Sequence, residues 1–298
     1  MTVSINVAIS PVSQPLKGVM LIALAVAVFA CVDAITKHLA TSWNVPLVVA
    51  TRYIVNVLAL AAVYAPSRGR ALIATKRTGL VFLRALCLSA ASLFAGLAPT
   101  RMPVAETISI IFLSPFVVMI LAIPLLGERV KPAGWIAAII GFCGVLLIAN
   151  PGNGLDPVGV FYAACCAIVT VGYYLLSRVL AATESTMALL FHTALVGAVL
   201  FGLYLPWSLH GPMLGTFDLM LFILIGLAAT LGHYLFTAAF RLAPASLLAP
   251  ANYLQLLWAG VIGWLVFDHV PTQTSIIGML IVGVAGAASA ILSRKKTS

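Results

Sequence analysis

The chain has 298 residues, of which 63% are hydrophobic and 8% are charged, and its mean hydropathy is +1.16. An ordinary soluble domain carries roughly a quarter charged side chains, so this composition excludes a soluble globular protein. The net charge of +9 comes from basic residues spread over short segments, which argues against a nucleic-acid partner. An integral membrane protein, with the lipid bilayer as its surroundings, is the remaining class.

A helix that crosses about 30 Å of hydrocarbon needs roughly 20 apolar residues. The apolar runs therefore predict ten transmembrane helices, at residues 17–38, 45–64, 79–98, 103–126, 132–150, 157–178, 185–206, 217–240, 243–267 and 272–293. The stretch from Thr2 to Pro15 is polar and mixed, so we expect no cleavable signal peptide. The five cysteines fall inside spans, and we interpret them as small core residues: Cys31, Cys87, Cys143, Cys165 and Cys166.

Lysine and arginine set the orientation, because they are retained on the cytoplasmic side of a membrane. With the N-terminus inside, twelve of the 16 basic residues are cytoplasmic and only Lys37 and Arg101 are outside. Arg52 and Arg84 lie within spans. The pattern predicts a multi-pass protein of the inner (plasma) membrane with both termini cytoplasmic.

The second half of the sequence repeats the first at an offset of 140 or 141 residues. The aligned pairs are Phe94 and Tyr234, Ala98 and Ala238, Arg101 and Arg241, Ala105 and Ala245, Leu125 and Leu265, Glu128 and Asp268, Tyr64 and Tyr204, Pro66 and Pro206, Gly18 and Gly159, and Lys37 and Arg178. Each copy contains five predicted helices. Because five is odd, the second copy enters the membrane from the opposite face.

The expected fold is an all-α integral membrane protein of two inverted five-helix repeats. Its parts are an N-terminal tail (1–16), a first repeat (17–150), a linker (151–156), a second repeat (157–293) and a basic tail (294–298). Inverted repeats can exchange inward-open and outward-open shapes around one midplane site. The duplication therefore favours a transporter by alternating access.

Two motifs in the first half carry a family resemblance. Phe112-Leu113-Ser114-Pro115 is followed by Leu125-Leu126-Gly127-Glu128-Arg129-Val130, and the pattern recurs around Tyr253-Leu254-Gln255 and Asp268-His269-Val270-Pro271. The chain resembles the drug/metabolite transporter superfamily, EamA family, although Asp268 stands in place of the usual Glu and Gln255 in place of a proline. The resemblance implies a ten-helix inverted-repeat fold and transport of small metabolites.

Within that family the chain looks most similar to the YddG group, which exports aromatic and other neutral amino acids. The resemblance thus implies an amino-acid substrate and outward transport. Related members carry nucleotide sugars, riboflavin, purines or cationic drugs, so transport of another metabolite or drug stays an alternative.

A substrate site is expected where polar residues share one helix face at midmembrane depth. The candidates are Ser89 and Ser92 in the third span, Glu106 and Ser109 in the fourth, Thr230, His233 and Thr237 in the eighth, and Asn252, Tyr253 and Gln255 in the ninth. Aromatic candidates for an apolar wall are Phe94, Phe112, Tyr234 and Trp258. The alternatives are helix-interface packing for the hydroxyl residues and lipid or core contacts for the aromatic ones.

Pro115 and Pro250 each remove a backbone hydrogen bond inside a span, so we expect hinges there. Asp33 and Lys37, four residues apart, are expected to form a local ion pair. Glu128 and Arg129, at the cytoplasmic end of the fourth span, are expected to fix a loop or a gate.

The sequence therefore predicts a secondary transporter, with a channel-like membrane protein as the weaker alternative. An enzyme is not expected, because we find no metalloprotease pair, phosphate-cradling loop or aspartate-rich motif in this sequence. We expect no cofactor and no metal. Whether protons act as a coupling ion stays open at this point.

Overall fold

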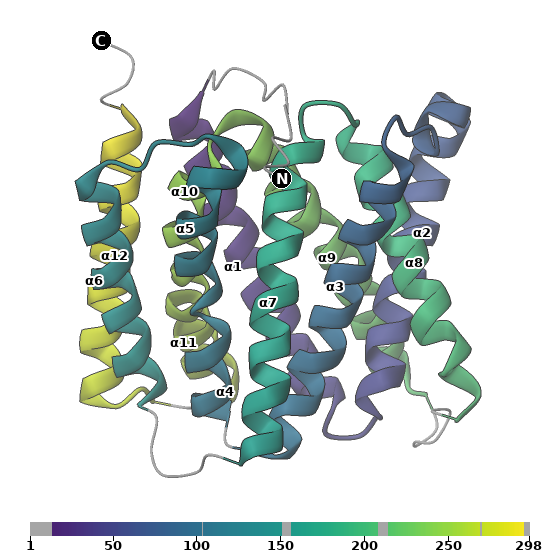
Figure 1. Cartoon of the computed structure of the whole chain (residues 1–298). Helices are drawn as coiled ribbons and strands as arrows, with labels where there is room; N and C mark the ends of the chain where they lie inside the picture. The colour runs from purple at the N-terminus through teal and green to yellow at the C-terminus, as the bar shows by residue number, and fades with distance from the viewer. Residues whose placement is uncertain (1–13, 103, 151–155, 208–213, 269, 295–298) are drawn as a thin grey trace.

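A computed structural model describes residues 14–102, 104–150, 156–207, 214–268 and 270–294 (Figure 1). Within these ranges all regular secondary structure is helical. Most of the predicted N-terminal tail, the linker residues 151–155 and residues 295–298 of the basic tail lie outside the described part of the chain.

The first repeat holds α1 (Pro15–Leu39), α2 (Val45–Arg68), η1 (Gly69–Leu72), α3 (Thr78–Leu97), η2 (Ala98–Thr100), α4 (Val104–Ile111), α5 (Ser114–Leu126) and α6 (Pro132–Ala149). The second holds α7 (Pro157–Leu180), α8 (Thr186–Leu203), η3 (Leu205–Trp207), α9 (Thr216–Leu242), α10 (Ala245–Leu248), η4 (Ala249–Tyr253), α11 (Leu254–Phe267) and α12 (Gln273–Arg294). Three of the long helices begin at a proline, which has no N–H to leave unpaired in the first turn.

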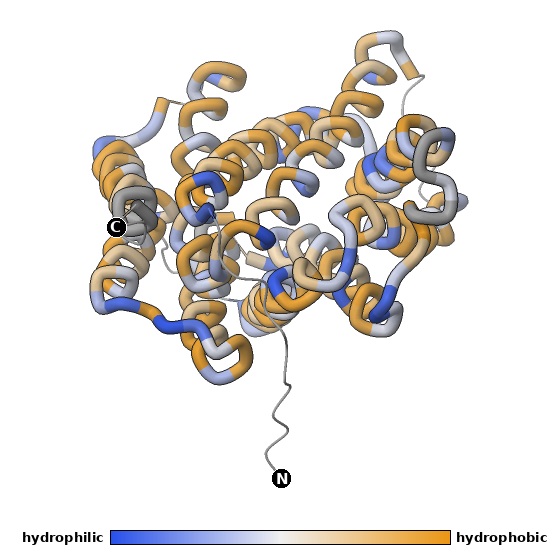
Figure 2. The backbone as a smooth tube through the Cα atoms, turned by 90° about the horizontal axis from the view of Figure 1, so that it is seen from above, coloured by the Kyte–Doolittle hydropathy of each residue, from blue (hydrophilic) through white to orange (hydrophobic). Residues whose placement is uncertain are grey.

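The helices match the predicted spans in number and place. Among the described residues, nine segments are long and apolar enough to cross a membrane, and the apolar stretch Gln273–Ala288 of α12 is shorter. The fourth span combines α4 and α5, and the ninth combines α10, η4 and α11. The tube seen from above is hydrophobic around its periphery (Figure 2), as lipid contact requires. The chain is an all-helical integral membrane protein.

Two helices are interrupted at equivalent places in the two repeats. The α-helix stops at Ile111 and resumes at Ser114 in the fourth span, and the ninth span passes through the 3₁₀ segment η4. Pro115 lies in the first turn of α5, and Pro250 lies in η4. The side-chain amide of Asn252 donates to the carbonyl groups of Leu248 and Ala249, at 3.1 and 3.2 Å, and so pairs backbone groups at the interruption. The predicted hinge prolines thus lie beside real interruptions, and their hinge role stays a prediction.

The helix packing follows the inverted repeat. α1 packs along α9, and the equivalent helices α7 and α3 pack along each other in the same way. α2 packs on its own counterpart α8, and α6 packs on its counterpart α12. These pairings bring helices of one repeat against helices of the other, so the two repeats are interlocked.

The molecule has two ends, which we name from Figure 1. The upper end holds the start of α1, the ends of α5, α7 and α9 and the end of α12; the lower end holds the ends of α1, α3 and α11 and the starts of α2 and α4. A large buried apolar cluster fills the upper half, and it includes Met119, Ala122, Phe236, Phe240 and Leu248. The upper half is therefore a packed core.

Candidate functional site

Two adjoining cavities, of about 390 and 180 Å³, lie between the helices. They share seven lining residues, which define what we call the central cavity: Asp33, Arg52, Ala91, Ser92, Thr170, Tyr174 and Gln255. The larger cavity extends to Val45, the first residue of α2, and to Gly96, next to the last residue of α3. The central cavity therefore reaches toward the lower end.

Opposite charges face this one cavity. Asp33, on α1, and Arg52, on α2, are the two formally charged side chains among the described residues that line it. Burying isolated charges in a bilayer is costly, so intramembrane charges usually face a cavity or a partner. A zwitterionic ligand could present an ammonium to Asp33 and a carboxylate to Arg52.

Each charged group makes a hydrogen bond to one neutral side chain of the cavity wall. The Gln255 amide, on α11, donates to the Asp33 carboxylate at 2.8 Å. The Arg52 guanidinium donates to the Ser92 hydroxyl, on α3, at 3.2 Å, and the Tyr53 hydroxyl lies 3.0 Å from the same hydroxyl. A carboxylate and a guanidinium have more hydrogen-bonding capacity than these contacts use, so both can still bind a ligand.

Aromatic rings supply the apolar wall. Phe112 and Tyr174 line the larger cavity, and Phe29, Tyr174 and Phe236 line the smaller one. The Tyr174 ring packs 5.0 Å from the Phe236 ring, between centroids. His233 also lines the smaller cavity; its Nδ1 lies 3.3 Å from the Tyr173 hydroxyl, and its ring centroid lies 4.8 Å from that of Phe29. Such a wall suits a flat apolar group beside a charged head group.

A buried cation, Arg84, contacts Tyr173 of the cavity wall. Arg84 is completely buried and makes five hydrogen bonds to neutral acceptors, which are Ser177 Oγ, Leu189 O, Thr193 Oγ1, Tyr173 OH and Thr237 Oγ1, at 2.7–3.3 Å. These acceptors belong to α7, α8 and α9, so Arg84 ties α3 to three helices of the second repeat. The Tyr173 hydroxyl continues the chain of contacts to His233.

Some predicted site residues come together at the cavity. Ser92, Phe112, Asn252 and Gln255 line the larger cavity, and His233 lines the smaller one. Pro115 lines the larger cavity as well. Asn252 has a second role, since its Oδ1 accepts a hydrogen bond of 3.3 Å from the Tyr174 hydroxyl.

The structure places other predicted site residues away from both cavities. Tyr234 and Trp258 are 39% and 38% exposed on the outside of the bundle. Thr237 is an acceptor for buried Arg84, and the Thr230 hydroxyl donates to the Gly226 carbonyl in its own helix, at 2.8 Å. In this conformation Thr230 and Thr237 make contacts within the helix bundle, as the alternative of interface packing describes, and Tyr234 and Trp258 lie where the alternative of lipid contact places them. Their part in substrate binding stays a prediction.

The remaining candidates are packing residues in this conformation. Phe94 stacks on Tyr162, with centroids 6.2 Å apart, while Ser89, Ser109 and Tyr253 are buried and Tyr253 packs beside Phe112. Pro250 is buried in η4. The side chain of Glu106 lies outside the described part of the structure.

The expected ion pair between Asp33 and Lys37 is wrong. The Asp33 carboxylate turns into the cavity toward Gln255, and the Lys37 ammonium lies 4.4 Å from the centre of the Phe267 ring. A contact across the bundle replaces the local contact that sequence spacing suggested.

The sequence reasoning missed most of the central cavity. Of the seven residues that define it, five were not among the predicted substrate-binding residues: Asp33, Arg52, Ala91, Thr170 and Tyr174. The repeat itself carries the signal: at an offset of 141, Asp33 corresponds to Tyr174 on the equivalent helix. Equivalent positions of an inverted repeat face the same midplane.

A model of the EamA-like transporter family matches residues 16–150 and again residues 157–291. The chain belongs to the EamA-like transporter family. Each EamA match covers one five-helix repeat, so the family pattern and the helix packing agree. The chain is therefore a member of a family of membrane transporters, and that family and the relatives below are transporters and not enzymes.

Several bacterial relatives of this EamA chain carry named substrates. An S-adenosylmethionine uptake transporter of Rickettsia bellii is 26% identical over 196 residues, 65% of this chain and 66% of that protein. A riboflavin transporter of Rhizobium johnstonii is 30% identical over 203 residues, 66% of this chain and 63% of that protein. These two matches span just under two thirds of each relative. A riboflavin transporter of Brucella anthropi is 26% identical over 251 residues, 82% of this chain and 88% of that protein.

A protein of known crystal structure has the same fold. It is 19% identical to this chain and superposes with a TM-score of 0.76, over 96% of this chain and 100% of that chain. At that identity the likeness establishes the fold alone.

Proposed function

We propose that this EamA protein is a secondary transporter that carries α-amino acids by alternating access at the central cavity, with aromatic and other neutral amino acids as substrates. The observation that carries the proposal is the pair of opposite charges in one apolar cavity. Asp33 would bind the α-ammonium group, and Arg52 would bind the α-carboxylate. The rings of Phe112 and Tyr174 would contact the amino-acid side chain.

The size of the site supports a small substrate. A larger cavity of about 390 Å³ is at the low end of the range for small-molecule pockets. S-adenosylmethionine, the substrate named for the Rickettsia bellii relative, also carries an α-amino-acid group. A charged pair that recognises this group is compatible with both substrates.

The proposed direction is export, which rests on the resemblance to amino-acid exporters, with the upper end facing the cytoplasm. The basic residues of the predicted cytoplasmic loops support that orientation. In that orientation the cavity described here reaches toward the outer face. Protons are the candidate coupling ion.

Riboflavin is a second candidate, because two relatives are named riboflavin transporters. Riboflavin has an uncharged flavin ring and no ammonium group. It would stack on the aromatic wall and make little use of the charge of Asp33.

Binding titrations separate these candidates. The purified protein in detergent is titrated separately with phenylalanine, N-acetylphenylalanine, S-adenosylmethionine and riboflavin. The proposal expects phenylalanine to bind and its N-acetyl derivative, which lacks the ammonium, to bind at least about tenfold more weakly. Equal binding of the two phenylalanine compounds, or binding of riboflavin alone, would contradict it.

A further inference from the structure

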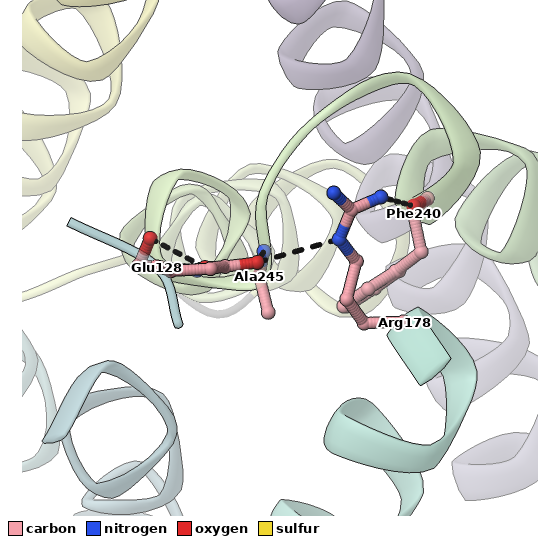
Figure 3. A network of polar contacts seen from close by, with 5 residues as sticks. Glu128, Arg178, Phe240 and Ala245 are labelled. Carbon is pink, nitrogen blue, oxygen red and sulfur yellow. Dashed lines mark hydrogen bonds and ion pairs between the residues drawn. The ribbon is translucent and has the colours of Figure 1, made fainter. Parts of the chain in front are cut away.

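The upper end of the molecule is closed by one carboxylate that joins three segments. Glu128, which follows α5, lies 3.3 Å from the guanidinium of Arg178 on α7, measured from Oε1 to Nε. Its two carboxylate oxygens also accept the backbone N–H groups of Ala245 and Ser246, each at 2.9 Å, at the start of α10 (Figure 3). Arg178 Nη1 donates to the Phe240 carbonyl at 2.8 Å. Glu128, from the first repeat, thus contacts α7 and α10 of the second repeat directly, and Arg178 extends the contact to α9.

This contact is buried, and backbone groups add hydrogen bonds to both of its side chains. The side chains of Arg178 and Glu128 are 2% and 7% exposed. A buried ion pair is stable only when its hydrogen-bond partners are all supplied, and the removal of one partner leaves an uncompensated charge. Breaking the contact part-way is therefore unfavourable, so it is expected to switch between a formed and a broken state, as a gate does. The rings of Tyr174, Phe236 and Phe240 pack between it and the central cavity, with centroids 4.9–6.0 Å apart.

The inverted repeat places the same chemistry at the lower end. Arg178 corresponds to Lys37 at an offset of 141, and Glu128 corresponds to Asp268 at an offset of 140. The start of α10 at Ala245 corresponds to residue 105 in the first turn of α4. The lower end therefore has the three parts of the upper-end contact. They are a cation on α1, a carboxylate directly after α11 and the N-terminus of a helix, α4.

The lower contact is not made in this conformation. Asp268 is exposed, and the Lys37 ammonium lies over the Phe267 ring instead. Across the described residues, the pair of Arg178 and Glu128 is the one ion pair found. At this end, where the two charges stay apart, the cavity extends to Val45 and Gly96. One end is thus locked and the other is open.

We propose that Lys37 and Asp268 form a second gate, which closes the lower end when the contact between Arg178 and Glu128 breaks. The inference rests on the proposed alternating-access function and adds the residues that hold each end shut. The two gates exclude each other, because the packing that seals the upper half must transfer to the lower half around the shared cavity. Asp268 is one methylene shorter than Glu128, so the lower gate needs a closer approach of its helices.

Labelling of a single cysteine at the lower end tests the gates without any substrate and leaves the four gate residues in place. In a protein whose five native cysteines are replaced by serine or alanine, Val45→Cys puts a thiol where the larger cavity reaches the lower end. The purified protein in detergent is treated with a hydrophilic maleimide, and mass spectrometry follows the rate of labelling. This rate is expected to be high, because the lower end is open.

The Glu128→Gln change is then added to Val45→Cys, because it removes the charge that holds the upper end. The expected result is labelling at least about threefold slower, since the lower end closes more often. A further Asp268→Asn change should restore the faster labelling, because the lower gate then lacks its carboxylate. Ser246→Ala, which removes only a 2.6 Å hydrogen bond to Glu128, should act in the same direction but less strongly. Asp156→Asn, at the N-cap of α7 near the lower end, is the matched control and should not change the labelling rate.

If neither Glu128→Gln nor Ser246→Ala slows the labelling, or if Asp268→Asn does not restore it, the gate assignment is wrong. The proposed function is tested separately, since substrate binding and transport are measured on the native protein. Unchanged labelling together with amino-acid transport by the native protein would reject the gate alone.

Discussion

The Asp33 carboxylate on α1 accepts a 2.8 Å hydrogen bond from the side-chain amide of Gln255 on α11. The two residues come from opposite repeats and meet at the central cavity. A bound ammonium group could replace the amide as the partner of Asp33. Substrate binding would then change a contact between the repeats, which links the site to the movement of one repeat against the other.

The first prediction concerns the charge of Asp33. Asp33→Asn keeps the shape and a hydrogen-bond acceptor but removes the negative charge. If a charge-assisted hydrogen bond of about 1.5–3 kcal/mol is lost, affinity for amino acids should fall roughly 10- to 150-fold. Calorimetric titration with phenylalanine measures this. Asp156→Asn, which alters a helix cap away from the cavity, is the control and should bind normally. Unchanged affinity in Asp33→Asn would remove this residue from the site.

The second prediction concerns Arg52. Arg52→Lys keeps the charge but loses the planar fork that can hold a carboxylate with two hydrogen bonds. We expect weaker binding of phenylalanine by about tenfold and almost no change for phenylethylamine, which lacks the carboxylate. Arg241→Lys, whose side chain donates to the Glu184 carbonyl at the upper end, is the matched control. Equal losses for both ligands would indicate a general structural effect instead.

The third prediction concerns stability and Arg84. Arg84→Met leaves the hydroxyl groups of Ser177, Thr193 and Thr237 without their buried donor. Ser177 and Thr193 keep the hydrogen bonds that they donate to carbonyl groups of their own helices, but the hydrogen bonds from Arg84 are lost, at about 0.5–1.5 kcal/mol each, so the thermal unfolding midpoint in detergent should drop. The midpoint of Arg84→Lys should lie between those of the native protein and of Arg84→Met, because an ammonium has three donors where the guanidinium has five. A midpoint unchanged in Arg84→Met would show that the network contributes little.

The fourth prediction concerns the contact of α6 with α12. A Cβ atom on Gly144 would lie 2.9 Å from the Gly278 carbonyl oxygen, and one on Gly278 would lie 2.7 Å from the Gly144 oxygen. Small residues allow such close backbone approach in membranes, so Gly144→Ala should lower the unfolding midpoint. Gly202 on α8 has no atom within 4 Å of that position, so Gly202→Ala should be neutral or stabilise by up to about 1 kcal/mol. The reverse order of the two midpoints would contradict this helix contact.

Hydrophobic run length and the repeat offset predicted much of the fold. Both follow from local composition, so ten spans and their places were accessible from the sequence alone. The helix interruptions could be predicted in part, because Pro115 and Pro250 have no backbone N–H to donate. The role of Asn252 in pairing the freed carbonyl groups was not accessible, since it depends on how the chain turns back in space.

The site was predicted less completely. His233 and Gln255 were predicted because polar residues inside spans are rare and costly, and both line the cavities. Tyr234 lies on the outside of the bundle and Thr237 pairs with Arg84, because composition alone does not tell a lipid face or a buried interface from a cavity face. The spacing of Asp33 and Lys37 suggested a local pair, but the contact of Asp33 with Gln255 joins residues 222 positions apart. Such contacts follow from helix packing that the sequence pattern does not specify.

Counterflow in proteoliposomes tests the central claim most directly. Liposomes containing the purified protein are loaded with unlabelled phenylalanine, and the entry of labelled phenylalanine is followed for the native protein and for Asp33→Asn. The account predicts saturable entry that depends on the internal load, and its loss in Asp33→Asn, with Asp156→Asn unaffected. Labelled phenylalanine that does not enter through the native protein, or that enters equally through Asp33→Asn, would contradict it.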